Sequence, residues 1–104
     1  MRLMGISTVK VNTATVRSFD SLPASQQAGM LPNDRQFRRF VAVRLGLTRS
    51  RDVEVSATAA AEYIRRTCGV ESRRSLNSNP TAVATFQAMR TDFDAWAGRI
   101  AQPR

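Results

Sequence analysis

Arginine is the residue type in this chain whose number and spacing could support binding chemistry. Of the 16 basic residues in 104, all but Lys10 are arginine, and with only eight acidic residues the formal net charge is +8. A guanidinium is planar and permanently charged, and its paired N–H groups match the oxygens of phosphates. The composition therefore indicates an anionic partner, and a DNA or RNA backbone is the first class to consider.

The spacing of the arginines adds to their number, because nine of them fall in three groups within residues 35–74. We predict that these nine contact phosphates: Arg35, Arg38 and Arg39; Arg49 and Arg51; and Arg65, Arg66, Arg73 and Arg74. If the two flanking segments are helices that pack antiparallel, the Arg49 to Arg51 loop lies at one end and the paired arginines lie at the other. A basic ridge of this kind could follow a phosphate backbone.

Two other interpretations of the arginines stay open. A GC-rich genome produces an arginine excess through codon usage alone. The arginines can also form an ordinary solvated surface with a few ion pairs. Acidic residues close enough in sequence to form such pairs are Asp34, Asp52, Glu62 and Glu71.

Enzymatic chemistry is not indicated. The chain has no histidine, which excludes Ser-His, Cys-His and His-metal sites. Cys68 reads as a small buried thiol, and Asp92 and Asp94, two apart on a helix, point to different sides. Asp52 and Glu54 lack a third metal ligand, and the glycines form no phosphate-binding loop. We therefore expect no catalytic residue, no metal site and no cofactor.

The first predicted helix spans residues 34–46. Asn33 as N-cap with Gln36 three residues later has the spacing of a capping box, and Gly46 can end the helix. Apolar residues recur on one face, and the arginines of this segment project from the other. The predicted inner face consists of Phe37, Phe40, Val41 and Leu45.

Two further helices are predicted over residues 57–68 and 80–97. Ser56 and Asn79 are suitable N-caps, and Gly69 and Gly98 are suitable ends. Between them, segment 70–76 reads as a turn or a single helical turn. The predicted inner faces consist of Ala57, Ala60, Ala61, Ile64 and Cys68 in the first, and of Ala82, Phe86, Met89, Phe93, Trp96 and Ala97 in the second.

The segment before residue 34 carries weaker signals. Residues 6–17 are rich in β-branched side chains and predict a short strand or small hairpin, whereas residues 18–33 predict a linker or an ordered loop. We therefore expect a mainly α fold with a minor β part. In this single domain, a three-helix core over residues 34–104 follows an N-terminal strand and loop segment over residues 1–33.

The sequence also bears on the cellular location of the protein. No apolar run approaches the ~18 residues that span a bilayer, and the N-terminus lacks the pattern of a secretory signal, which predicts a cytoplasmic protein without membrane contact. A single cysteine allows no disulfide within the chain.

The strings DRQFRRF, LGL, AAEYIRRTCGVESRRSL and FDAW together resemble the small stand-alone accessory proteins of phages and prophages from GC-rich bacteria. The resemblance spans residues 34–97 and carries over no functional residue. It implies a role in phage recombination or replication, or in binding and disabling a host machine such as a defence complex.

These observations favour a small nucleic-acid-binding accessory protein that contacts phosphates. The alternative is an inhibitor that docks its basic face on an acidic or nucleic-acid-binding surface of a host protein. A third interpretation is a homodimeric structural component, paired through the Ala-rich face of segment 57–68 or through the aromatic stripe. A helix-turn-helix is not favoured, because Arg65 occupies the place of a small residue and the segment after Gly69 is short.

Overall fold

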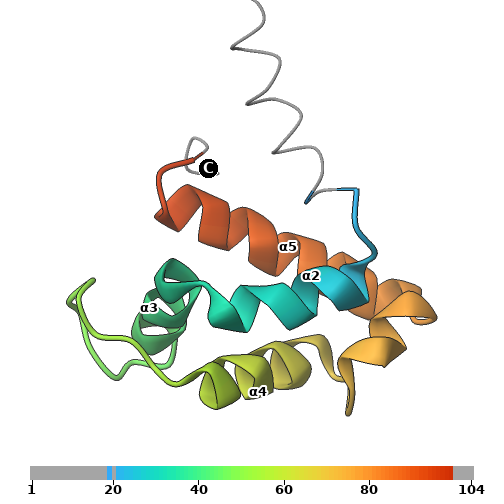
Figure 1. The fold of residues 1–104 in the computed structure, drawn as a ribbon, viewed down its shortest axis with the longest axis horizontal. Coiled ribbons are helices and arrows are strands. Elements are labelled where there is room, and N and C mark those ends of the chain that lie inside the picture. Colours follow the sequence, from blue (N-terminus) through green and yellow to red (C-terminus); the bar gives the residue numbers. More distant parts are fainter. Residues whose placement is uncertain (1–18, 20, 100–104) are drawn as a thin grey trace, which may run out of the picture.

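The computed structural model describes residues 19 and 21–99, and every regular element in this part of the chain is helical (Figure 1). The elements are α2 (Ala24–Met30), the 3₁₀ helix η1 (Leu31–Asn33), α3 (Arg35–Arg44), α4 (Ala57–Cys68), the 3₁₀ helix η2 (Arg73–Asn77) and α5 (Pro80–Trp96). The predicted, mainly helical fold is confirmed. The predicted strand or hairpin of residues 6–17 lies outside the described residues.

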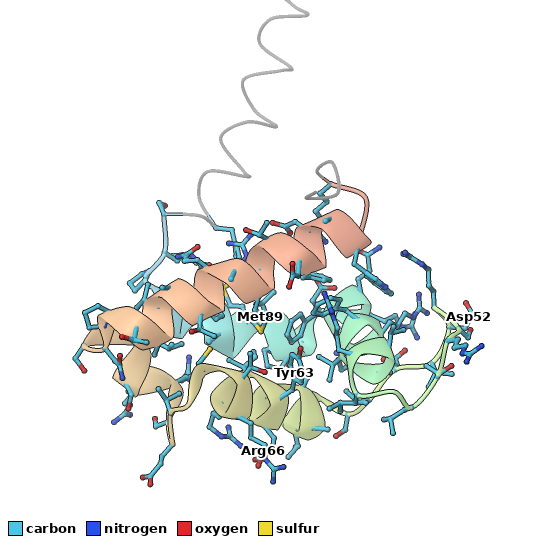
Figure 2. The ribbon with its side chains drawn as sticks, turned by 180° about the vertical axis from the view of Figure 1, so that it is seen from behind. Asp52, Tyr63, Arg66 and Met89 are labelled. Atoms are coloured by element: carbon cyan, nitrogen blue, oxygen red, sulfur yellow. The ribbon has the colours of Figure 1, made fainter. Side chains whose placement is uncertain are left out.

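The elements form two layers. In Figure 1, α2, η1 and α3 follow one another across the middle of the molecule, with α5 above them and α4 below. Seen from behind, α5 and α4 lie in front of that layer (Figure 2). The α3–α4 loop projects at one end of the molecule, and η2 packs against α2 at the other. None of the described helices combines the length and the apolar character needed to cross a bilayer.

Side-chain caps define where α3, α4 and α5 begin. Ser56 accepts a hydrogen bond from the amide of Ala59, and Asn79 accepts one from the amide of Ala82, so both predicted caps are confirmed. The predicted cap Asn33 is wrong, because it ends η1. The cap of α3 is Asp34, whose backbone is extended and whose carboxylate accepts from the amide of Gln36 at 2.8 Å.

The same C-terminal motif ends all three of these helices. Each has a glycine with positive φ whose amide bonds the carbonyl three residues back, while the next amide bonds the carbonyl five residues back. The second set of bonds joins Leu47 to Ala42, Val70 to Arg65, and Arg99 to Asp94. The motif stops α3 at Arg44 and α5 at Trp96, slightly before the predicted ends.

The core lies where α3, α4 and α5 meet. The ring of Phe93 lies 5.2 Å from that of Phe37 and 5.4 Å from that of Phe40, and all three rings are buried. The central residues of each predicted inner face are buried as expected. Leu45 is exposed, at 51%, because α3 ends before it and Leu45 lies past the core. Ala57 and Ala61, predicted for the inner face of α4, are only half-buried.

Residues 24–33 correct the prediction of a linker or ordered loop, because they form α2 and η1. Polar residues at buried positions of α2 conceal the helical period that apolar residues would have shown. Gln27 is 2% exposed, its Nε2 donates to the carbonyl of Leu22 at 2.9 Å, and its Oε1 accepts from Arg90 at 2.9 Å.

Candidate nucleic-acid interface

The nine predicted phosphate-binding arginines lie toward two ends of the molecule. One group comes from α3 and the α3–α4 loop, and the other from the last turn of α4 and from η2 (Figure 1). This placement of the loop opposite the paired arginines is the one that the sequence predicts. The contacts of each guanidinium then decide which arginines can meet a ligand.

On α3, two arginines bind one carboxylate. Glu54 accepts from Arg35 Nε at 3.0 Å and from Arg38 Nη2 at 2.8 Å. The hydrogen bond from Arg38 is the main cause that lowers the pKa of Glu54 below its usual range, and the charge of Arg35 adds to it. Arg38 also donates to the carbonyl of Pro32, and its side chain is only 20% exposed. Arg38 is therefore a structural tie between α3, η1 and the end of the loop.

On α4, Glu62 joins two arginines in the same way. Its Oε1 accepts from Arg65 Nη2 and its Oε2 from Arg66 Nε, each at 2.8 Å, so the predicted pairing of Glu62 with Arg66 is confirmed. The hydrogen bond from Arg65, followed by that from Arg66, lowers the pKa of Glu62. The side chain of Arg66 is 80% exposed and points away from the rest of the molecule (Figure 2). Two guanidinium charges and one carboxylate leave this cluster with a net positive charge.

Arg73 has a structural role that the sequence did not indicate. Its Nη1 donates to the carbonyl of Ser25 at 3.1 Å and lies over the backbone of Gly29. A Cβ at Gly29 would overlap Nη1 and lie 2.7 Å from Cζ. Arg73 therefore holds η2 against α2, and part of its donor capacity is used there.

The remaining arginines differ in their availability. Arg51 donates to the carbonyl of Trp96 at 2.8 Å, and its Cζ lies 4.3 Å from the centre of the indole ring. Within the described residues, Arg39, Arg49 and Arg74 form no ion pair. Arg49 and Arg74 are exposed, whereas Arg39 is half-buried and its Nε has no hydrogen-bond partner.

In residues 19 and 21–99, the acidic residues and the cysteine form no group of three that could hold a metal ion. Asp94 is used by Arg90 and Arg99, at 3.3 and 3.1 Å, and Asp92 pairs with Arg44 at 3.4 Å. Cys68 is buried, and burial raises the pKa of its thiol, which disfavours the reactive thiolate.

Local and distant pairings explain what sequence reasoning found and missed. Glu62 and Arg66 are four apart on one helix, which a helical spacing reveals. Arg35 and Glu54 are 19 apart, and Arg73 and Ser25 are 48 apart, so only the packed fold brings them together. The only feature of the sequence that could have indicated an ion pair of Glu54 is its position next to a basic loop.

The available basic groups are therefore concentrated in two places. The last turn of α4 and η2 offer Arg65, Arg66 and Arg74, while the other end offers Arg35 and Arg49. Comparisons of the chain with protein-family models, with curated proteins and with solved structures found no match.

Proposed function

We propose that the chain is an accessory nucleic-acid-binding protein whose main phosphate contacts come from the α4–η2 corner, defined as Arg65, Arg66 and Arg74. The observation that carries the proposal is the pair of guanidiniums on Glu62, with the Arg66 side chain 80% and the Arg65 side chain 34% exposed, because two arginines on one carboxylate keep a net positive charge at the surface. Arg74 on η2, six residues beyond the end of α4 at Cys68, adds a second positive charge that forms no ion pair within the described residues.

The pairing with Glu62 leaves donors for a ligand. A guanidinium has five N–H groups. Arg65 binds Glu62 through Nη2 and Arg66 binds it through Nε, so each retains N–H groups that can meet phosphate oxygens. The carboxylate restricts the rotamers of both side chains, which reduces the entropy that binding would cost.

The same corner favours backbone contacts over base reading. The segment that follows α4 is a 3₁₀ helix of five residues, which is short for a recognition helix in the major groove. Phosphate contacts fix position without reading sequence, so we expect similar affinity for different sequences.

Fluorescence anisotropy with labelled duplex DNA and single-stranded RNA tests the proposal over a range of salt concentrations. With ~4–6 phosphate contacts, the slope of log affinity against log salt on duplex DNA should be about −4 to −5, because each contact releases counterions. Absence of binding at ~50 mM salt would reject the nucleic-acid proposal. The alternative, in which the chain inhibits a host protein, would then be favoured.

Two charge-matched variants localise the site. The pair Arg66→Gln and Arg74→Gln and the control pair Arg35→Gln and Arg49→Gln each remove one ion-paired and one unpaired arginine. The first should flatten the slope by about 2 units, at ~0.9 per contact, and weaken binding to all sequences alike. The control should leave the slope nearly unchanged. Equal losses in both would show that affinity follows net charge and not this corner.

Affinity purification from the native host, with and without nuclease, separates this proposal from the inhibitor alternative. Nuclease should release the partners of a nucleic-acid binder and leave those of an inhibitor in place. A homodimer would need a surface other than the two predicted ones, because Ala60 and Ile64 on α4 and Phe86 and Phe93 on α5 are buried within one chain.

A further inference from the structure

The α3–α4 loop, defined as residues 45–56, carries an unusual share of exposed apolar side chains. Leu45, Leu47 and Val53 are 51%, 65% and 45% exposed. In the described part of the chain, the only other large apolar side chain exposed to this extent is Met30 on α2, at 49%. Such a concentration on one loop is typical of a surface that contacts a partner.

The helix ends show that this exposure is specific to the loop. In the C-terminal motif shared by the three helices, the residue after the glycine commonly packs back on its own helix. At α4 this residue is Val70, which packs against the core, and at α5 it is Arg99, which binds Asp94 at 3.1 Å. At α3 it is Leu47, and it stays 65% exposed. The fold itself therefore does not use Leu47.

The loop is fixed although its apolar side chains are exposed. Arg51 ties its middle to the end of α5 through the carbonyl and ring of Trp96. Glu54 ties its end to α3 through Arg35 and Arg38, and the amide of Val55 donates to the carbonyl of Arg38 at 3.3 Å. A loop held at these points presents its side chains at a low entropic cost of binding.

The charges on the loop narrow the partner class. Arg49 is exposed and forms no ion pair within the described residues, so it attracts carboxylates. Arginine is enriched at protein interfaces, and an apolar patch on a partner protein can cover leucine and valine, which phosphates cannot do. A protein partner can place its carboxylates beside Arg49 and away from the exposed Asp52, whereas an anionic membrane would present phosphates to both side chains, and this disfavours a membrane.

We propose that the α3–α4 loop docks on a partner protein that presents carboxylates beside an apolar patch, with Leu45, Leu47 and Val53 covered by the partner and Arg49 paired with its acids. This surface lies at the opposite end of the molecule from the α4–η2 corner (Figure 1). The docking proposal therefore does not depend on whether the chain binds nucleic acid.

The test uses the full chain, isotopically labelled, and a synthetic amphipathic peptide of leucine and glutamate with leucines at helical spacing. NMR titration should show shifts concentrated on the α3–α4 loop. The variant L45S/L47S/V53S should bind the peptide at least tenfold more weakly. The control M30S, which removes a comparably exposed apolar side chain elsewhere, should bind like the parent chain. Replacing the glutamates of the peptide by glutamine should also weaken binding, because the pairing with Arg49 is lost.

Several results would overturn the docking proposal. These are equal affinity of L45S/L47S/V53S and the parent, shifts outside the loop, or no binding at ~1 mM peptide, the weak limit of specific association. Binding of phosphatidylserine vesicles but not of the peptide, abolished in the loop variant, would assign the loop to membranes instead.

The thermal midpoint of the L45S/L47S/V53S variant should stay close to that of the parent, since exposed side chains contribute little to stability. Its duplex DNA binding should be unchanged, which keeps the two proposals distinguishable.

Discussion

The guanidinium of Arg73 contacts α2 at Gly29, and this contact depends on Gly29 having no side chain. The guanidinium of Arg73 uses the space beside Gly29 to reach the carbonyl of Ser25. Gly29 is helical, so alanine would favour α2 by about 1 kcal/mol in the absence of Arg73. In the parent chain the same substitution displaces the guanidinium and weakens its hydrogen bond.

A double-mutant cycle measures this coupling. In the Arg73→Ala background, Gly29→Ala should stabilise the protein by about 0.5–1 kcal/mol through helix propensity. In the parent background that gain should disappear or change sign, since a hydrogen bond worth roughly 1 kcal/mol is lost. Chemical denaturation of the four proteins gives the coupling energy. Equal stabilisation in both backgrounds would show that Arg73 makes no useful contact with α2.

Glu62 and Glu54 link stability to pH, because arginine neighbours lower the pKa of each carboxyl in the folded chain. The folded state therefore binds fewer protons than the unfolded state in acid. The stabilisation is complete above the ordinary glutamate pKa of 4.5 and is lost as the pH falls through the lowered value.

The variant Glu62→Gln should be slightly less stable than the parent at neutral pH and should lose less stability on acidification below about pH 4.5. Thermal midpoints between neutral and strongly acid pH check this, and the exposed Glu71→Gln serves as the control. Identical pH profiles for the parent and Glu62→Gln would contradict the role of the two arginines.

At the scale of the elements, the sequence predicts three helices because each has a side-chain cap, a terminal glycine and an apolar face that agree. Two caps are located correctly, and the third is misplaced by one residue because η1 extends to Asn33. α2 was missed because the face it buries carries Ser25 and Gln27, so no hydrophobic period marks it. The arginines of the site could be predicted individually, whereas their long-range partners follow only from packing.

The packing of α5 on α3 gives the largest expected mutational effect. Phe93 is fully buried against the rings of Phe37 and Phe40, so Phe93→Ala should destabilise the protein by about 3–5 kcal/mol. Urea denaturation provides the measurement, with Leu47→Ala as an exposed control that should change stability by under about 0.5 kcal/mol. A loss below about 1 kcal/mol for Phe93→Ala would contradict the described core.

At the scale of the whole molecule, the α4–η2 corner and the α3–α4 loop lie at opposite ends of one helical body (Figure 1). Sites that share no partners usually contribute additively. We therefore expect one chain to bind duplex DNA and the acidic peptide at the same time.

Titration of the acidic peptide into the preformed complex with labelled DNA tests this expectation. The peptide affinity should stay within about twofold of its value without DNA, since independent sites have little coupling energy. The R66Q/R74Q variant should bind the peptide normally and serves as the control. Release of the DNA by the peptide would show that both ligands compete for one surface.

The short length of α2 also has a consequence for local opening. A helix of seven residues is not stable by itself, and α2 depends on contacts that Gln27 and Gly29 make with Arg90 and Arg73, both distant in sequence. The amides of α2 should therefore exchange with deuterium sooner than those of α5. Losing the Arg73 contact should accelerate exchange in α2 and η2 together, so that two segments more than 40 residues apart open as one unit.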